Sequence, residues 1–402
     1  MTPSNLIFSD HQYTYYKLEG DGELWIFEGV TEPEYKEYVS QLQSDPTLRP
    51  YSNTLFGNNP SYSFLSEDRL LHTYFTASRL RAHVILEPQS TSLFHGLPPK
   101  EAPAFEPMCT PHLAVMSLDY SAQNSNDANG MSYVFRLTDG SFLIYDGGYL
   151  QDAQRLYAYL REHSPFEHEK IVISAWILTH SHIDHYSCFM GFSCMFADKV
   201  KVKRFLFNTP AKDESIINLK QHDNFLNTKF YEHAKKYPNA EIIRVHTGQL
   251  LKLPGAEIEI LQTYEDLLPG KIRWLNEASL VTRVRIAGQT FLFPADTEMA
   301  GDLALERYSR FLKSDFLQVT HHGYSGGTLY LVDRIDPKYL LWTTNFECYT
   351  QRTVRTWHAS VNRYLLSCRA VDYSFVADGD CKILHLPFQG LKELEYYQYS
   401  KQ

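Results

Sequence analysis

Residue types that bind metals fill positions 180–185, where the chain reads His-Ser-His-Ile-Asp-His. Imidazole nitrogens and carboxylate oxygens are the usual protein ligands of zinc, and they also serve iron and manganese. Alternate side chains of an extended segment share a side, so His180 and His182 would point one way while Asp184 and His185 serve a neighbouring position. This spacing predicts a site for two divalent cations.

The alternative is a solvated loop that happens to be rich in histidine, and the segment before the cluster argues against it. Residues 171–179 read Ile-Val-Ile-Ser-Ala-Trp-Ile-Leu-Thr, an apolar and β-branched run typical of a buried central strand. A dense polar cluster at the end of such a strand is costly to bury unless its groups bind a partner. We therefore expect the strand to present the four ligands at its end.

Two aspartates close similar apolar runs. Asp296 ends Phe-Leu-Phe-Pro-Ala-Asp, and its carboxylate has one oxygen for each of two cations, so it could bridge them. Asp146 ends Ser-Phe-Leu-Ile-Tyr-Asp and precedes two glycines, where a turn-forming aspartate is the competing explanation.

A histidine pair, His321 and His322, follows a third short strand-like run, residues 315–320, and precedes Gly323. Taken alone, this pair is typical of capped or surface histidines. Placed after a strand, in a chain that also carries the cluster at 180–185, it favours a further contribution to the metal site.

The elements that must position these residues include two β-hairpins that resemble each other. Residues 132–146 and 279–296 share a Ser-x-Val-x-Arg start, a glycine turn and an apolar strand that ends at aspartate. The pattern predicts a domain built from two similar halves, although hairpins also resemble each other through shared turn chemistry.

The chain divides into three parts. Residues 1–87 predict a small α+β N-terminal domain whose helix starts at a capping box of Thr31 and Glu34 and buries Tyr35, Tyr38, Val39 and Leu42. Six prolines in residues 88–111 predict an extended linker. Residues 112–402 alternate strands with a few helices and carry all the candidate ligands. We expect them to form the catalytic domain.

Composition disfavours several classes of protein. With 44% hydrophobic residues and a formal charge of −9, the chain is expected to fold and lacks the overall basic field of a non-specific nucleic-acid binder. No signal peptide or membrane-length apolar run is present, which predicts a cytoplasmic protein without membrane contact. The six cysteines have no metal-site or C-x-x-C spacing, so we expect buried, reduced thiols, including Cys188 and Cys194.

The order Asp146, His180-x-His182-x-Asp184-His185, Asp296 and His321 resembles the metallo-β-lactamase family. The segments NEASLVTRVRIAGQTFLFPAD and LQVTHHG are most similar to the branch that contains the hydrolase domain of bacterial competence proteins and phosphorylcholine esterase. The resemblance covers about residues 112–385. It implies a four-layer αββα sandwich, in an α+β chain that starts with the small N-terminal domain.

The resemblance also implies roles for the ligands. His180 and His182 would hold the first metal, while Asp184, His185 and His321 would hold the second. Asp296 would bridge the two, and Asp146 would be a structural anchor beneath them. Zinc is the expected metal, with manganese or iron as alternatives.

Three departures from the family pattern stand out. The histidine that many members place before the bridging aspartate has no counterpart at Gln262-Thr263-Tyr264, so the third ligand of the first metal stays open, with His246 and Asn276 as candidates. Cys188 replaces a common glycine and Tyr324 a common serine. Both bear on the substrate more than on the metal.

The chemistry this predicts is hydrolysis by a hydroxide formed between two cations about 3.5–4 Å apart. Asp184 would orient the hydroxide, and His322 or Tyr324 would stabilise the developing anion or protonate the leaving group. His322 could instead orient its loop. The amides of Gly323–Gly327 could hold a phosphate.

The resemblance favours a phosphodiesterase acting on a small phosphate ester rather than on nucleic acid. A carboxylic ester, lactone or amide hydrolase is the alternative, because the same hydroxide attacks carbonyls. An iron-dependent oxidoreductase and a non-catalytic binding protein are alternatives of other classes. The N-terminal domain could select the substrate or form a homodimer, and the sequence decides neither.

Overall fold

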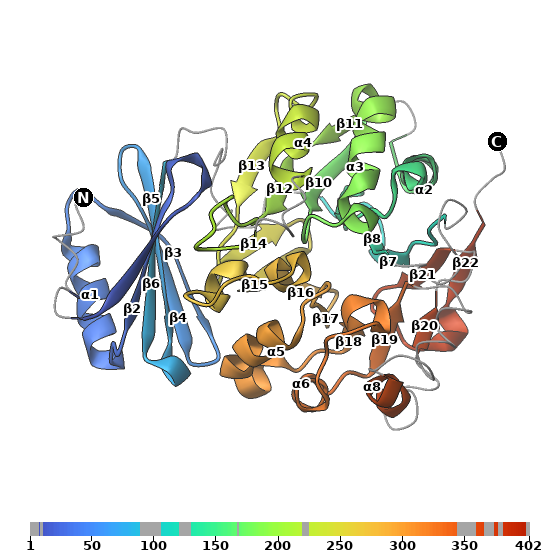
Figure 1. Ribbon diagram of the computed structural model, residues 1–402. Helices are drawn as coiled ribbons and strands as arrows, with labels where there is room; N and C mark the ends of the chain where they lie inside the picture. The colour runs from blue at the N-terminus through green and yellow to red at the C-terminus, as the bar shows by residue number, and fades with distance from the viewer. Residues whose placement is uncertain are drawn as a thin grey trace.

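A computed structural model describes Phe8 and residues 11–88, 106–119, 130–166, 169–218, 225–343, 359–365, 374–376 and 381–398. Three β-sheets organise these residues (Figure 1). The first lies on the N-terminal side of the molecule, and the other two pack against each other with helices on their outer faces.

The first sheet is antiparallel, with strand order β1-β2-β6-β5-β4-β3. Its strands are β1 (Tyr13–Lys17), β2 (Glu23–Glu28), β3 (Arg49–Phe56), β4 (Asn59–Leu65), β5 (Arg69–Thr76) and β6 (Arg81–Pro88). Helix α1 (Glu32–Ser44) covers the face turned away from the rest of the molecule (Figure 1). The predicted capping box of Thr31 and Glu34 is present and the predicted apolar face is buried, so this helix is confirmed.

The second sheet carries the strand that leads into the histidine cluster. Its order is β13-β12-β10-β9-β8-β7-β21-β22, and β11 also pairs with β10. The strands are β7 (His112–Val115), β8 (Ser132–Arg136), β9 (Phe142–Asp146), β10 (Ile171–Ile177), β11 (Val200–Val202), β12 (Arg204–Phe207), β13 (Glu241–Arg244), β21 (Cys381–His385) and β22 (Glu395–Tyr397). The run at 171–177 is the buried, central β10, as predicted.

The third sheet carries the bridging-aspartate candidate and the histidine pair. Its order is β14-β15-β16-β17-β18-β19-β20. The strands are β14 (Leu250–Leu253), β15 (Ala256–Gln262), β16 (Val281–Ile286), β17 (Gln289–Phe293), β18 (Phe316–Gln318), β19 (Tyr339–Trp342) and β20 (Ser374–Val376). Asp296 follows β17 and His321 follows β18, and these two strands are parallel neighbours.

The second and third sheets and their helices form four layers. Apolar side chains from the inner faces of both sheets make one core. Helices α2 (Ala153–His163), α3 (Ile183–Phe196) and α4 (Phe225–Ala234) cover the second sheet, and α5 (Met299–Leu305), α6 (Leu329–Ile335) and α8 (Ala359–Tyr364) lie on the side of the third (Figure 1). The predicted α+β class and αββα sandwich are confirmed.

The two predicted hairpins occupy corresponding places in the two sheets. The antiparallel pair β8 and β9 leads into the parallel neighbour β10, and the pair β16 and β17 leads into the parallel neighbour β18. This arrangement agrees with two similar halves. It also explains why candidate ligands from both halves meet, because corresponding strand ends face the same edge of the sandwich.

The predicted boundary between the N-terminal domain and the rest falls at the end of β6. Most of the proline-rich linker predicted at 88–111 lies outside the described residues. The first sheet also packs its second face on the catalytic part, where Tyr16, Ile26 and Ile85 join a core with Ile217, Tyr264 and Leu275.

A buried ion network links the two parts, and we call Glu87, Arg244, His246 and Glu265 the interface network. Glu87 on β6 lies 3.2 Å from Arg244 Nη1 and 3.2 Å from His246 Nε2, and His246 Nδ1 lies 3.0 Å from Glu265 Oε1. Burial by itself lowers the pKa of His246, but the two carboxylates outweigh it and raise the pKa to about 9. His246 is therefore protonated at neutral pH and holds two carboxylates together.

Among the described residues, no helix combines the length and apolar character that a membrane crossing requires.

Candidate metal centre

The side chains of the predicted cluster meet at the edge shared by the second and third sheets. His180 and His182 stand in the loop after β10, and Asp184 and His185 lie in the first turn of α3. Asp296 arrives from the loop after β17. A short helical turn, η9 (Thr320–Gly323), adds the histidine pair from the loop after β18. Loops after several neighbouring strands thus converge on one place.

These residues form two overlapping groups whose candidate ligand atoms lie within 4.8 Å of one another. One group contains His180, His182 and Asp296, and the other contains Asp184, His185, Asp296 and His322. Asp296 belongs to both groups, which is the position that a bridging carboxylate requires.

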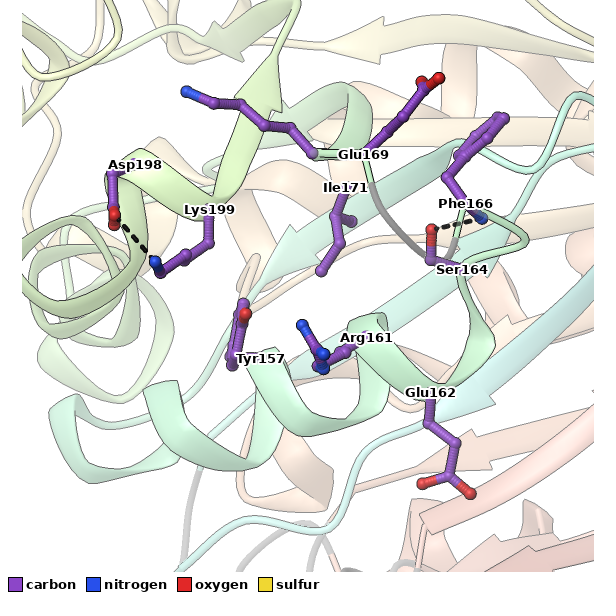
Figure 2. A pocket seen from close by; sticks show the side chains of 10 residues that line it. Tyr157, Arg161, Glu162, Ser164, Phe166, Glu169, Ile171, Asp198 and Lys199 are labelled. Carbon is purple, nitrogen blue, oxygen red and sulfur yellow. Dashed lines mark hydrogen bonds and ion pairs between the residues drawn. The ribbon is translucent and has the colours of Figure 1, made fainter.

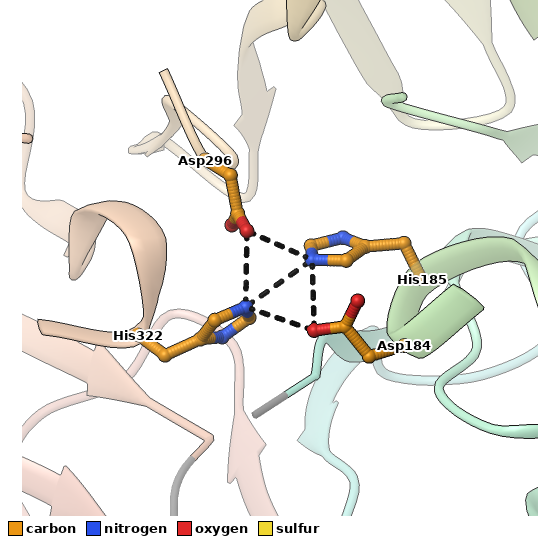
Figure 3. Close-up of side chains that lie close together, drawn as sticks. All are labelled: Asp184, His185, Asp296 and His322. Atoms are coloured by element: carbon orange, nitrogen blue, oxygen red, sulfur yellow. Dashed lines mark hydrogen bonds and ion pairs between the residues drawn. The ribbon is translucent and has the colours of Figure 1, made fainter. Parts of the chain in front are cut away.

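The second group is the tighter one (Figure 3). His185 Nε2 and His322 Nε2 are each 3.2 Å from Asp296 Oδ2, and they are 3.2 Å from each other. Asp184 Oδ2 lies 3.6 Å from His322 Nε2 and 3.8 Å from His185 Nε2. Four ligand atoms therefore face one small space.

The first group shares the same carboxylate. His180 Nε2 lies 3.1 Å from His182 Nδ1 and 3.8 Å from Asp296 Oδ2. Burial and the neighbouring His185 lower the pKa of His180, and burial lowers the pKa of His182. Both rings are therefore neutral at pH 7 and offer lone pairs, which is the form of histidine that binds a metal.

Asp146 anchors the cluster from beneath. Its carboxylate lies 2.8 Å from His185 Nδ1 and accepts hydrogen bonds from the amide of Thr179 at 2.8 Å and from its hydroxyl at 2.7 Å. Burial opposes a proton on His185, but the carboxylates of Asp296, Asp184 and Asp146 outweigh it and raise the pKa of the ring well above its usual value. A cation at Nε2 would take the place of that proton, while Nδ1 keeps its hydrogen bond to Asp146. Asp146 also has a left-handed φ of 53° before Gly147, so it stands in a turn and at the same time contacts His185.

The arrangement fits divalent cations. Asp296 is 1% exposed, and its Oδ1 has no hydrogen-bond partner among the described residues. Two pairs of imidazole nitrogens face each other at 3.1 and 3.2 Å. A buried carboxylate oxygen without a partner and nitrogens that face each other are costly unless they coordinate an ion.

The two histidines of the pair lie at different distances from Asp296, and their roles stay predictions. His322, predicted as a catalytic group, lies in the ligand group. His321, predicted as a ligand, lies farther out, with Nε2 3.6 Å from Asp296 Oδ2 and 3.3 Å from Asn276 Nδ2, and with Nδ1 in contact with the hydroxyl of Ser325. Both histidines have left-handed φ angles, 46° and 53°. Such strain at ordinary residues is typical of functional sites.

Gly323 makes that turn possible. A Cβ at this position would lie 2.2 Å from the ring of Trp342, and the φ of Gly323 is +77°. Trp342 Nε1 in turn donates to the carbonyl of His322 at 2.7 Å. The ring of Trp342 therefore fixes the loop that aims His322 at Asp296.

Three further residues considered in the sequence analysis, Tyr324, Cys188 and Cys194, differ in how exposed they are. Tyr324 is partly exposed, with its ring centroid 5.7 Å from that of His321. Cys188 is buried, and its Sγ is 2.9 Å from where a Cβ on Gly147 would lie, so it packs beneath the site as expected. Cys194 is exposed, which corrects the expectation of a buried thiol, because its turn of α3 faces solvent near Lys236.

The two candidates for the missing ligand lie in different places. His246 belongs to the interface network. Asn276 stands beside the cluster, and its Oδ1 is buried without a hydrogen-bond partner in the described part of the chain. Its Nδ2 lies 3.4 Å from Glu298, a residue that the sequence patterns did not single out. In the sequence, Glu298 could have been found only from its place two positions after Asp296.

The predicted phosphate-binding amides of Gly323–Gly327 are partly engaged. The amide of Tyr324 donates to the carbonyl of His321 at 2.7 Å, and Asp302 accepts from the amide of Gly327. Burial raises the pKa of Asp302 to about 7. A carboxyl group already occupies one end of this loop, which leaves fewer amides for a substrate anion.

A hollow in the surface lies well away from the cluster. It has a volume of about 500 Å³ and is lined by residues around the end of α2 and the start of β10, among them Arg161, Glu169 and Lys199 (Figure 2). The metal cluster follows the other end of β10, roughly 20 Å away at strand spacing. The hollow carries both signs of charge and does not contribute to the cluster.

Comparison with models of protein families and with curated proteins finds no match. Several solved structures are similar. The metallo-β-lactamase fold protein YhfI of Bacillus subtilis is 13% identical, with 67% of this chain and 97% of that chain covered and a TM-score of 0.42. CmlA, a diiron β-hydroxylase of Streptomyces venezuelae, is 13% identical, with 89% and 79% covered and a TM-score of 0.40.

Human tRNase Z, short form, is also similar, at 11% identity over 58% of this chain and 92% of that chain, with a TM-score of 0.33. The four-layer sandwich and the cluster of candidate metal ligands at its edge agree with the fold that the sequence resemblance implied. The branch within that fold stays a prediction.

Proposed function

We propose that this protein is a hydrolase that uses two divalent cations, zinc first among them, to cleave a phosphodiester in a small molecule. The observation that carries the proposal is the buried Asp296, whose carboxylate is shared by two groups of histidine and aspartate side chains and has one oxygen without a partner in the described part of the chain. Bound cations would lower the pKa of water and polarise the bond under attack.

The distances suggest which residues hold the cations. His180, His182 and Asp296 would hold one, and Asp184, His185, Asp296 and His322 the other. We assign His322 to the ligands and His321 to the substrate side, the reverse of the sequence expectation, because His322 Nε2 is closer to Asp296 than His321 Nε2 is.

The partly exposed groups are placed to act on the substrate. The side chains of Asp184 and His321 are 15% and 14% exposed, while those of His185 and Asp296 are at most 1% exposed. We therefore assign the orientation of the attacking water to Asp184. His321 and Tyr324 are placed to hydrogen-bond the reacting group.

Hydrolysis of a carboxylic ester or lactone is the second candidate. It is favoured by the engaged amides of the loop after His322 and by the scarcity of basic residues nearby, since a neutral carbonyl substrate needs less positive charge. The phosphodiesterase and the ester or lactone hydrolase would use the same metal ligands and would differ in their substrate.

The test is the metal content of the purified protein by mass spectrometry, together with hydrolysis of bis(p-nitrophenyl) phosphate before chelation, after chelation and after return of the metal. We expect close to two metals per chain and turnover that is lost on chelation and in Asp184→Ala. Metal with turnover only on p-nitrophenyl acetate or a lactone would favour the second candidate, and iron with oxygen consumption would favour an oxidoreductase. A metal-free, inert protein that cannot be reloaded would exclude the enzyme.

A pair of variants tests the roles of the histidines. We expect His322→Ala to lose metal, and His321→Ala to keep metal but turn over slowly. His385→Ala is the control, because His385 lies on β21 and bonds Glu395 away from the cluster. Loss of metal in His321→Ala with full metal in His322→Ala would restore the expectation drawn from the sequence.

A further inference from the structure

Large apolar side chains stand exposed near the opening of the metal centre, by which we mean the place where the side chains of Asp184 and His321 reach solvent. We define the apolar rim as Ile183, Trp274, Met299 and Tyr324. These residues are between 47% and 59% exposed, although large apolar side chains are usually buried. Exposed apolar groups that gather at one place mark a surface that binds something.

Each rim residue is close in the sequence to a residue that belongs to the metal centre or contacts it. Ile183 lies between His182 and Asp184, and Tyr324 has its ring 5.7 Å from the ring of His321. Met299 follows Glu298, and Trp274 precedes Asn276 by two residues.

The polar residues that neighbour the rim residues in the sequence lie in contact with one another. Asn276 Nδ2 lies 3.3 Å from His321 Nε2 and 3.4 Å from Glu298 Oε1, and His321 Nε2 lies 3.6 Å from Asp296 Oδ2. Because successive Cα atoms are about 3.8 Å apart, every rim residue stands within about two residues of this connected set. The four exposed apolar residues therefore all lie close to this opening.

The charge around the opening does not suit a polyanion. In the segments 180–185, 273–277, 296–300 and 320–325, Arg273 is the one lysine or arginine in the sequence. Its guanidinium Nη2 lies 2.6 Å from Glu277 Oε1, so its charge is already paired. Asp184 and Glu298 add negative charge to the same opening. A nucleic acid would need several free cations here.

We infer that the substrate carries an apolar alkyl or aromatic group, which lies on the apolar rim while the reacting group sits at the cations. This inference rests on the proposed hydrolase function. The rim supplies affinity through burial of the apolar group, and the polar groups of the opening supply orientation.

Two substrates that share a reacting group test the inference, namely methyl p-nitrophenyl phosphate and octyl p-nitrophenyl phosphate. We expect kcat/KM for the octyl ester to be at least about tenfold higher, mostly through KM, since burial of roughly two of its additional methylenes suffices for this factor. Trp274→Ser and Met299→Ser should each reduce the ratio of octyl to methyl. Leu55→Ser, which removes an exposed apolar side chain of β3, should leave the ratio unchanged.

A binding measurement separates failure of the inference from failure of the hydrolase proposal. Calorimetry on the full chain, with octylphosphonate and methylphosphonate below micellar concentration, should show tighter binding of octylphosphonate, reduced by Trp274→Ser. Octyl preference in binding without any hydrolysis would keep the rim and overturn the hydrolase.

Equal kcat/KM and equal binding of the octyl and methyl compounds would overturn the inference while the hydrolase stands. The p-nitrophenyl ester of thymidine monophosphate adds a further outcome. If it is cleaved faster than the octyl ester, the substrate is a nucleotide and the apolar rim has another use.

Discussion

Two buried clusters of histidine and carboxylate lie in this molecule, and they differ in what the ring nitrogens face. In the interface network, both nitrogens of His246 face carboxylates, from Glu87 and Glu265. In the metal centre, Nε2 of His185 and Nε2 of His322 share one carboxylate oxygen, Asp296 Oδ2, and also face each other, and His180 faces His182. A ring that has a separate carboxylate of its own for each nitrogen holds a proton and stabilises the fold, whereas ring nitrogens that share one carboxylate oxygen and face each other leave room for a cation. Burial of histidine therefore does not identify a metal site, but the atoms that face its lone pairs do.

The largest expected effect comes from a substitution that disrupts the metal centre. We expect Asp296→Ala to lower hydrolysis about ten-thousandfold, because the cations that this carboxylate bridges contribute several kcal/mol to catalysis. Thermal unfolding gives a second measurement, since zinc should raise the Tm of the wild type and not of the variant. Two bound metals and an unchanged response to zinc in Asp296→Ala would contradict the bridging role.

The next largest expected effect comes from a substitution that disrupts the interface network. Glu87→Gln leaves the buried charges of Arg244 and His246 short of a partner, so we expect the free energy of unfolding to fall by about 3–5 kcal/mol, with metal content per folded chain unchanged. Urea unfolding measures this. Glu28→Gln is the control, because the Glu28–Arg81 pair at 2.6 Å is partly exposed and should contribute less than about 1 kcal/mol. Equal losses in the two variants would remove the contrast between buried and exposed pairs.

The pH dependence of stability sharpens the comparison. The pKa of His246 is raised from 6.5 to about 9, so its contribution is fully present below pH 6.5 and is lost as the pH rises through 9. Between pH 6.5 and 9.5 we expect the wild type to lose up to about 3 kcal/mol more than His246→Gln. Glu265→Gln should move this window to lower pH. Parallel pH profiles for the wild type and His246→Gln would show that the ring carries no proton here.

The smallest expected effect concerns orientation within the metal centre. Asp146→Asn keeps the shape of the side chain but removes the charge that orients His185, so we expect metal affinity to fall about 10–100-fold. Competition with a chelator measures this affinity. Asp139→Asn, in the turn between β8 and β9, contacts Ser141 and no ligand, and should leave the affinity unchanged. Equal affinity in Asp146→Asn would mean that packing alone orients the ring.

Local patterns in the sequence were sufficient for much of the fold and for the place of the site. Helix α1, the central strand β10 and the two hairpins were readable because capping, β-branched runs and glycine turns act between near neighbours in the chain. The positions at 180–185 and Asp296 were readable for the same reason, as polar groups at the ends of apolar strands.

Contacts between distant parts of the chain decided the rest. The choice between His321 and His322 depends on two left-handed residues and on Trp342, which lies 20 positions away. The place of His246 depends on Glu87, 159 positions away, and the apolar rim joins segments from Ile183 to Tyr324. The sequence by itself determined which residue types stand at the ends of the strands, because that follows from local periodicity. Only the tertiary structure decided which nitrogen faces which carboxylate, because adjacent side chains point in different directions and long-range packing selects between them.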